Sequence, residues 1–211
     1  MTAASAPRVL VACEFSGVVW DEFIRAGCNA VSCDLLPTER PGPHYQGNVF
    51  DILRDGWDLM IAFPPCTHIS VSGARHFWRK EKEQAEALSF FRRLLDAPVP
   101  RICIENPVGV ASSKICRPSQ IVHPWQFGDE AEKTTCLWLR WLPLLIPTKI
   151  VGRGEFHLLP NGNRIPKWYS NGRSWKTRSR TFPGIARAMA DQFSPVLFRR
   201  LSIGHRAEIP A

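Results

Sequence analysis

The sequence predicts an α/β protein with a mostly parallel sheet and helices on both faces. Three features lead to this prediction: short runs rich in β-branched residues, helix-like segments between them, and unusual polar or thiol side chains directly after the runs. The expected strands cover residues 8–13, 30–34, 58–63 and 101–105. Because strands alternate with helices, the chain should cross over between parallel neighbours.

The expected helices have recognisable ends. The segment 18–27 closes with Gly27, and the segment 81–97 begins with acidic residues, which favour a helix N-terminus. Four apolar side chains of the second segment are expected on one helical face: Ala85, Leu88, Phe91 and Leu95. A terminal helix is expected at 183–193.

Composition narrows the class of protein. The chain has 211 residues, of which 45% are hydrophobic and 22% are charged, and this suits one full-sized domain with at most a small appendage. The formal net charge of +8 favours a polyanionic partner where basic residues also cluster. Seven scattered cysteines without a C-x-x-C pair indicate reduced cytosolic thiols, with neither a disulfide framework nor a metal site.

The domain organisation is predicted from changes in amino-acid composition along the chain. Residues 144–180 are rich in Pro, Gly, Asn and basic side chains, which predicts a small loop-rich insert between two parts of a main domain, 1–143 and 181–211. No signal peptide is recognised, and the most apolar stretch, 137–147, is too short to span a bilayer. We therefore expect a soluble cytoplasmic protein without membrane contact.

Cys66 follows two prolines at the end of an expected buried strand. Prolines cannot donate to a sheet ladder, so Pro64 and Pro65 should end the strand and stiffen the turn after it. A thiol presented there could be activated as a nucleophile by a helix N-terminus or a proton acceptor. The ordinary alternative, a small buried hydrophobe, is expected for three other cysteines: Cys13, Cys28 and Cys103.

Glu105 ends another expected strand, within "IENP" at 104–107. A carboxylate at such a position is costly to desolvate unless it is paired or protonated, and either condition changes its pKa. A raised pKa would make Glu105 a proton donor at neutral pH. The alternative is a structural carboxylate that accepts a neighbouring backbone N–H.

The segment "CEFSG" at 13–17 lies between the first strand and the first helix, where Gly17 would let the backbone approach a ligand. Asp34 ends the second strand and is placed to accept hydrogen bonds from a ribose. The sequence contains neither G-x-x-x-x-G-K nor G-x-G-x-x-G, so a nucleoside-type cofactor without a bound phosphate is favoured.

The segment 165–180 interleaves large aromatic residues with cations. Rings can stack on bases and cations can bind phosphates, so the segment suits contact with nucleic acid; a solvated basic loop is the alternative. The side chains concerned are Trp168, Tyr169, Trp175, Lys167, Arg173, Lys176, Arg178 and Arg180.

Together these motifs resemble those of the DNA cytosine-5 methyltransferases, most closely the compact, phage-type members. The segment "PPCTHISVSG" (64–73) is similar to the catalytic loop, "ENP" (105–107) to the glutamate motif, and "RTFPGIARAMA" (180–190) to the final motif. "FSGVV" (15–19) is similar to the S-adenosylmethionine loop, and "GNVFD" (47–51) to the segment that contacts adenine.

The chain also departs from the family pattern. Asn48 stands where an aspartate is usual. The Q-x-R-x-R segment is missing, and "EKTTCLWL" (132–139) occupies its place, which leaves Lys133, Arg178 or Arg180 as substitutes.

The resemblance implies methyl transfer from S-adenosylmethionine to C5 of a flipped-out DNA cytosine, with Cys66 bonded to C6 and Glu105 protonating N3. The implied catalytic residues are Cys66, Glu105, Pro65 and Asn106. The implied cofactor-binding residues are Phe15, Ser16, Gly17, Val18, Asp34, Leu35, Asn48, Val49, Asp51, Pro64 and Pro183. The implied DNA-binding residues are Ser70, Arg75, Lys133, Lys167, Trp168, Arg173, Lys176, Arg178 and Arg180.

The resemblance also bears on partners and place of action. It implies double-stranded DNA as partner, a bacterial or phage-infected cytosol and, because the insert is short, a very short recognition site. No obligate protein partner is implied. Two other functions stay open: C5 modification of cytosine in a free nucleotide or in RNA, and nucleic-acid binding with a lapsed active site.

Overall fold

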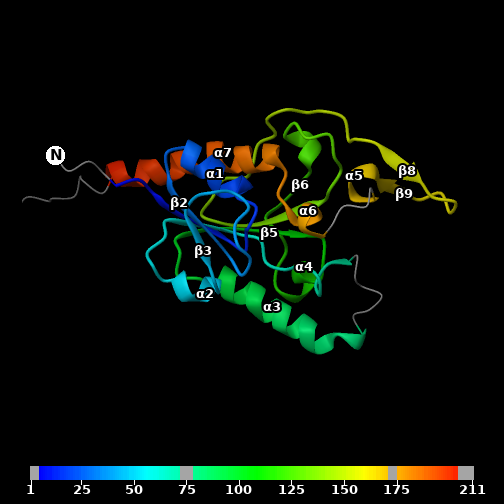
Figure 1. Ribbon diagram of the computed structural model, residues 1–211, viewed down its shortest axis with the longest axis horizontal. Helices are drawn as coiled ribbons and strands as arrows, with labels where there is room; N and C mark the ends of the chain where they lie inside the picture. Colours follow the sequence, from blue (N-terminus) through cyan, green and yellow to red (C-terminus); the bar gives the residue numbers. More distant parts are fainter. Residues whose placement is uncertain (1–4, 72–77, 171–174, 204–211) are drawn as a thin grey trace, which may run out of the picture.

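The computed structural model describes residues 5–71, 78–170 and 175–203, with a seven-stranded sheet at its centre (Figure 1). The strand order is β3-β2-β1-β4-β5-β7-β6. Strands β1 to β5 run parallel to one another, and β7 runs antiparallel to both β5 and β6. The strands are β1 (Arg8–Ala12), β2 (Asn29–Asp34), β3 (His44–Gln46), β4 (Leu59–Ala62), β5 (Arg101–Pro107), β6 (Gln120–Val122) and β7 (Thr135–Arg140). The predicted mostly parallel sheet is confirmed.

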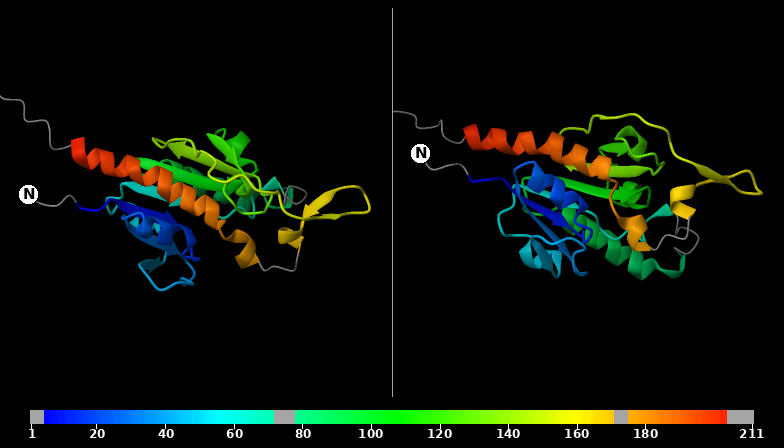
Figure 2. Two further views of the ribbon diagram at one scale, coloured as in Figure 1. Left: turned by 90° about the horizontal axis from the view of Figure 1, so that it is seen from above. Right: turned by 45° about the horizontal axis from the view of Figure 1, so that its top comes forward.

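Helices cover both faces of the sheet, as predicted. Figures 1 and 2 show α1 and α7 on one face, and α2 and α3 on the other. The helices are α1 (Val18–Arg25), α2 (Val49–Ile52), α3 (Glu81–Leu95), α4 (Ala111–Lys114) and α7 (Pro183–Ile203), with a 3-10 turn at Pro124–Gln126. The terminal helix α7 extends beyond its predicted end at residue 193.

Alternate side chains of the central strands enter two apolar cores. In β1, Val9 and Val11 pack in the core beneath α1 and α7, whereas Leu10 and Ala12 pack in the core beneath α3. Because both faces of the strands are buried, they read as continuous apolar runs rather than alternating ones. This is why the sequence identifies the central strands.

The predicted inner face of α3 is wrong at one position. Phe91 is fully buried and Leu88 packs partly against the core, but Ala85 is exposed and Leu94 is buried instead. At 3.6 residues per turn, two successive steps of three residues rotate Ala85 about 120° away from Phe91. The contact stripe therefore continues through Leu94 and not through Ala85.

The predicted insert, 144–180, begins along the body and then leaves it. Leu145 is buried, and its backbone exchanges hydrogen bonds of 2.7 and 2.8 Å with the side chain of Gln120. Strands β8 (Phe156–Leu158) and β9 (Arg164–Pro166) then form an antiparallel hairpin, which projects from the body in Figures 1 and 2. Helices α5 (Lys167–Ser170) and α6 (Trp175–Ser179) follow it.

Within residues 5–71, 78–170 and 175–203, no helix is both long enough and apolar enough to span a membrane.

Candidate active site

The side chains that the sequence singles out lie at one edge of the sheet. Strands β1, β2, β4 and β5 are parallel, so their carboxyl ends meet at this edge. The chain leaves β1 to form β2 and β3 on one side, and then forms β4 on the other side of β1. In open α/β sheets, ligands bind outside the strand ends at such a reversal of strand order.

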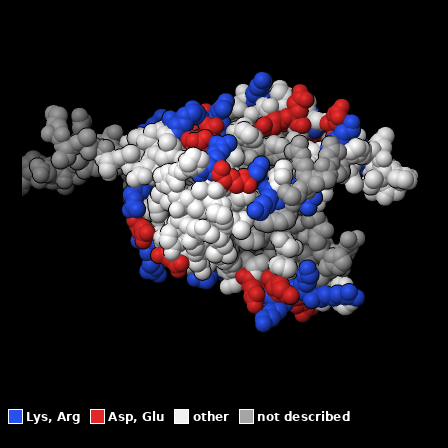
Figure 3. Space-filling view, in the orientation of Figure 1, with Lys and Arg blue, Asp and Glu red and all other residues white. Residues whose placement is uncertain are grey.

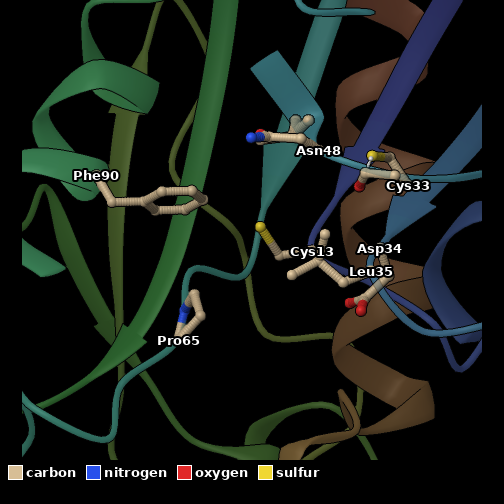
Figure 4. A pocket seen from close by; sticks show the side chains of 9 residues that line it. Cys13, Cys33, Asp34, Leu35, Asn48, Pro65 and Phe90 are labelled. Carbon is tan, nitrogen blue, oxygen red and sulfur yellow. Dashed lines mark hydrogen bonds between the residues drawn. The ribbon is translucent and has the colours of Figure 1, made fainter. Parts of the chain in front are cut away.

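A pocket with an empty volume of about 530 Å³ opens at this edge (Figure 4). Its lining comes from the ends of four strands and from α3: Cys13, Cys33, Asp34, Leu35, Gly47, Asn48, Val49, Pro65 and Phe90. These residues include neither lysine nor arginine. The pocket therefore suits a flat, mostly apolar group that carries a few polar atoms.

Four predicted cofactor-binding residues line this pocket: Asp34, Leu35, Asn48 and Val49. Asp34 ends β2, and its Oδ1 accepts a hydrogen bond of 2.9 Å from Leu36 N. Burial raises the pKa of Asp34 above its ordinary value. Pro65, predicted as catalytic, also belongs to the lining, which places the residue before Cys66 at the pocket wall.

Seven predicted cofactor-binding residues lie outside this lining: Phe15, Ser16, Gly17, Val18, Asp51, Pro64 and Pro183. Asp51 accepts a hydrogen bond of 3.2 Å from the Tyr45 hydroxyl, and Pro183 is exposed in the first turn of α7. For these seven, contact with a cofactor stays a prediction.

Three side chains that line the pocket are not among the predicted site residues: Cys13, Cys33 and Phe90. Cys13, expected to pack as a small hydrophobe, has a backbone φ of 58° and lies at the pocket, and Phe90 faces it from α3 (Figure 4). Phe90 directly precedes the core residue Phe91 in α3. Adjacent residues of a helix point about 100° apart, so the Phe90 ring points in a different direction from the buried Phe91 ring. Cys28 and Cys103 are buried, as predicted.

The two pocket cysteines are neutral thiols at neutral pH. Burial, reinforced by the charge of Asp34, raises the pKa of Cys13 far above its ordinary value and that of Cys33 to about 12. All seven cysteines of the chain are free. Within the described part of the chain, no group of three or more His, Cys, Asp or Glu side chains could hold a metal ion.

A buried carboxylate organises the turn between β1 and α1. Glu14 Oε1 accepts hydrogen bonds from Ser16 Oγ and from Val18 N, the latter at 3.1 Å, and so caps the first turn of α1. Gly17 supplies a left-handed backbone with φ of 74°, and a Cβ there would lie 2.9 Å from the side chain of Arg40. Burial raises the pKa of Glu14. Glu14 is not among the site residues predicted from the sequence.

Asn106 holds the Pro-Pro-Cys turn against β5. Its side chain is buried, and Nδ2 donates a hydrogen bond of 2.8 Å to Pro64 O. The chain then turns back on itself, because Ser70 N donates to Cys66 O at 2.9 Å. Ser70 is buried and forms a β-bridge with Gly109. One end of the loop that carries Cys66 is thus fastened to β5, and the other end to the segment that follows β5.

Glu105 and Lys133 form an ion pair beside Cys66. Glu105 Oε1 lies 3.5 Å from Lys133 Nζ, and their side chains are only 11% and 18% exposed. Burial and the Glu105 charge raise the pKa of the Cys66 thiol, while the Lys133 charge lowers it. The net effect is a raised pKa, contrary to the expectation of an activated thiolate. Cys66 is therefore a protonated thiol at neutral pH.

We expect two substitutions to move the thiol pKa of Cys66 in opposite directions. Glu105→Gln removes a charge that raises this pKa, so thiolate should form at lower pH. Lys133→Met removes a charge that lowers it, so thiolate should need higher pH. The measurement is the pH dependence of iodoacetamide alkylation, followed on the Cys66 peptide by mass spectrometry, with the exposed Cys116 as internal reference. Shifts in the same direction would contradict this arrangement of charges.

The structure distributes the predicted DNA-binding residues over different surroundings. Arg75 and Arg173 lie outside the described residues, and Ser70 is buried rather than presented at the surface. Lys167 pairs with Glu155 at 2.8 Å, and Arg180 pairs with Glu39 at 2.6 Å. Ion pairs that are exposed to solvent are weak, so these side chains can exchange partners.

The base of the insert is fastened next to Lys133. Trp168 Nε1 donates a hydrogen bond of 3.0 Å to Glu132 O, and its ring packs edge-on against Phe182 at 5.3 Å. Arg178 lies over the ring of Tyr169 at 5.2 Å, and Lys176 lies in α6. Of the predicted substitutes for the missing arginines, Lys133 is the one that the structure pairs with Glu105.

Charges on the face drawn in Figure 3 are mixed in sign. Lys and Arg side chains lie mainly around the margin of this face, next to Asp and Glu, and a wide uncharged area separates them. Among the residues described there, the basic side chains do not form one continuous patch.

Comparison with solved structures gives distant likenesses in fold. The search of solved structures finds a 16S rRNA methylase, RmtB, at 13% identity and a TM-score of 0.35, over 64% of this chain. The match covers 55% of the methylase, so the chain spans about half of that protein. No family model matches, and no curated protein sequence matches. A likeness this weak carries no argument about activity, which must come from the site itself.

Proposed function

We propose that this protein is an S-adenosylmethionine-dependent methyltransferase that modifies C5 of cytosine in DNA through Cys66. The proposal depends on one observation. Cys66, Glu105 and Lys133 lie together next to Pro65, which forms part of the pocket wall. A nucleophile, a carboxyl group and a cation beside a pocket lined by a carboxylate and apolar side chains are the parts that this reaction needs.

The pocket residues fit the proposed cofactor. Asp34 offers carboxylate oxygens to ribose hydroxyls, Leu35 and Phe90 offer apolar surface to a flat ring, and the lining holds no cation for a phosphate. When bound, S-adenosylmethionine supplies the methyl group in electrophilic form. The buried Glu14, at the turn into α1, adds a carboxyl group close to this edge.

In the proposed mechanism, Cys66 Sγ forms a bond to C6 of the cytosine and gives up its proton to the Glu105 carboxylate. Glu105 passes this proton to N3, which spreads the charge that develops on the ring and leaves C5 nucleophilic. After methylation, C5 loses its proton to solvent and the C6–S bond breaks, while the proton on N3 returns through Glu105 to Cys66, so that the thiol is restored. The raised pKa of the Cys66 thiol means that deprotonation must accompany the approach of the base.

Lys133 serves two purposes in this proposal. It neutralises Glu105 and lowers the pKa of the Cys66 thiol, so it favours attack by sulfur. Its position depends on the insert, because Trp168 holds the backbone carbonyl of the preceding residue, Glu132. Binding of nucleic acid to the insert would therefore act directly on the ion pair of Glu105 and Lys133.

The substrate is tested by supplying labelled S-adenosylmethionine with duplex DNA, RNA or dCMP in parallel. We expect label in DNA, as 5-methylcytosine, and none with Cys66→Ala. Label in RNA or dCMP instead would show that RNA or the free nucleotide is the substrate, while the proposed methyl transfer through Cys66 would stand. Binding of S-adenosylmethionine without transfer to any of the three would support a lapsed site. Bisulfite sequencing of the methylated DNA should show a very short site.

DNA binding by the wild type should weaken strongly as salt rises, because phosphate contacts release counterions. Replacing Lys167, Arg173 and Lys176 together by Gln should weaken binding about equally on all sequences and should flatten the salt dependence. The measurement is fluorescence anisotropy with two unrelated duplexes between 50 and 200 mM salt, roughly the range over which such contacts respond. An unchanged salt slope would show that these side chains do not bind DNA.

A further inference from the structure

Asn48 presents a hydrogen-bond donor to the pocket, because its acceptor is already used. Asn48 is the N-cap of α2, and its Oδ1 accepts a hydrogen bond of 3.1 Å from Phe50 N. Turning the amide around would bring Nδ2 against the Phe50 N–H, so two donors would face each other. The cap therefore determines which end of the amide is available.

The available end is at the pocket. Asn48 lines it, and Figure 4 shows the side-chain amide extending into the space that Phe90 faces from the other side. Among the described residues, no group accepts a hydrogen bond from Asn48 Nδ2. The apolar side chains of Leu35 and Val49 complete this part of the wall.

We propose that Asn48 selects a hydrogen-bond acceptor on the edge of the ring system that enters this pocket. The inference rests on the proposed function, in which that ring is the adenine of the cofactor. Adenine offers ring nitrogens as acceptors and its 6-amino group as a donor. Asn48 Nδ2 binds a ring nitrogen and disfavours direct contact with the amino group.

Asn48→Asp tests this without disturbing α2. Aspartate is as good an N-cap as asparagine, so one carboxylate oxygen still accepts from Phe50 N while the other faces the pocket as an acceptor. Asn48→Ser also keeps a capping oxygen and removes the amide without adding charge. Asn163→Asp, in the β8–β9 hairpin, adds the same charge away from the pocket and serves as the matched control.

The probe is S-adenosylhomocysteine, measured by calorimetry, with its 1-deaza-, 3-deaza- and 7-deazaadenine analogues. Asn48→Asp and Asn48→Ser should each weaken binding of the parent compound about tenfold, on the scale of one hydrogen bond, with little change in melting temperature. One deaza analogue should bind the wild type about tenfold more weakly than the parent compound does. The Asn48 variants should bind this analogue as well as the wild type binds it, because the hydrogen bond is already lost. Asn163→Asp should bind like the wild type.

Two results would overturn the inference while leaving the proposed function in place. One is binding of the parent compound by Asn48→Asp as tight as, or tighter than, binding by the wild type. The other is equal binding of all three deaza analogues and the parent by the wild type. If the wild type binds neither S-adenosylhomocysteine nor S-adenosylmethionine, the proposed function itself is wrong, and the inference is wrong with it.

Discussion

DNA that carries 5-fluorocytosine should trap the wild-type protein as an adduct that survives denaturation. The fluorine at C5 cannot leave as a proton does, so the bond between Cys66 Sγ and C6 cannot break after methyl transfer. Cys66→Ala should form no adduct and should lose all detectable methylation. The adduct is seen as a slow band on a denaturing gel, and mass spectrometry of the digested band should find the modified peptide that contains Cys66.

Two controls show whether the loss of the adduct in Cys66→Ala comes from the missing nucleophile, and not from unfolding or from reaction of another thiol. Cys116→Ala removes an exposed thiol and should leave trapping unchanged. Cys66→Ala should keep the wild-type melting temperature to within a few degrees, because Cys66 is only partly buried. An adduct that persists in Cys66→Ala would reject Cys66 as the nucleophile.

Glu105→Gln should bind DNA and S-adenosylmethionine nearly normally but lower kcat by roughly 10²–10⁴, the scale of general acid catalysis. The amide keeps the shape of the side chain and can still accept a hydrogen bond from Lys133, but it cannot supply a proton to N3 in the same way. The loss should appear in single-turnover kinetics and not in KM.

Glu132→Gln is the matched control for that substitution. The Glu132 carboxylate also pairs with a cation, Arg153, and lies in the adjoining segment, but it is not beside Cys66. Its activity should stay within a few-fold of the wild type. An equally small loss in Glu105→Gln would show that Glu105 only supports the structure.

Local patterns in the sequence were enough to predict the central part of the fold. Residues 9–12 of β1 and Leu59–Ala62 of β4 are buried on both faces of the sheet, so these runs are apolar without interruption. Pro64 and Pro65 end a strand because neither can donate a ladder hydrogen bond, and this marks Cys66 without any knowledge of its neighbours. The edge strands β3 and β6 are three residues each and half-exposed, so no comparable pattern marks them.

Only the tertiary structure decided which residues meet at the site. Lys133 lies 28 positions after Glu105, and it reaches that carboxylate because β7 pairs antiparallel with β5, in a register that sets Thr135 opposite Pro107. Phe90 packs against the edge of the core and also lines the pocket, because the rotation of α3 sets it at the boundary between the two. Local sequence determines which segments become strands and where a reactive side chain follows one. Contacts between distant segments depend on register and on helix rotation, which short-range patterns do not encode.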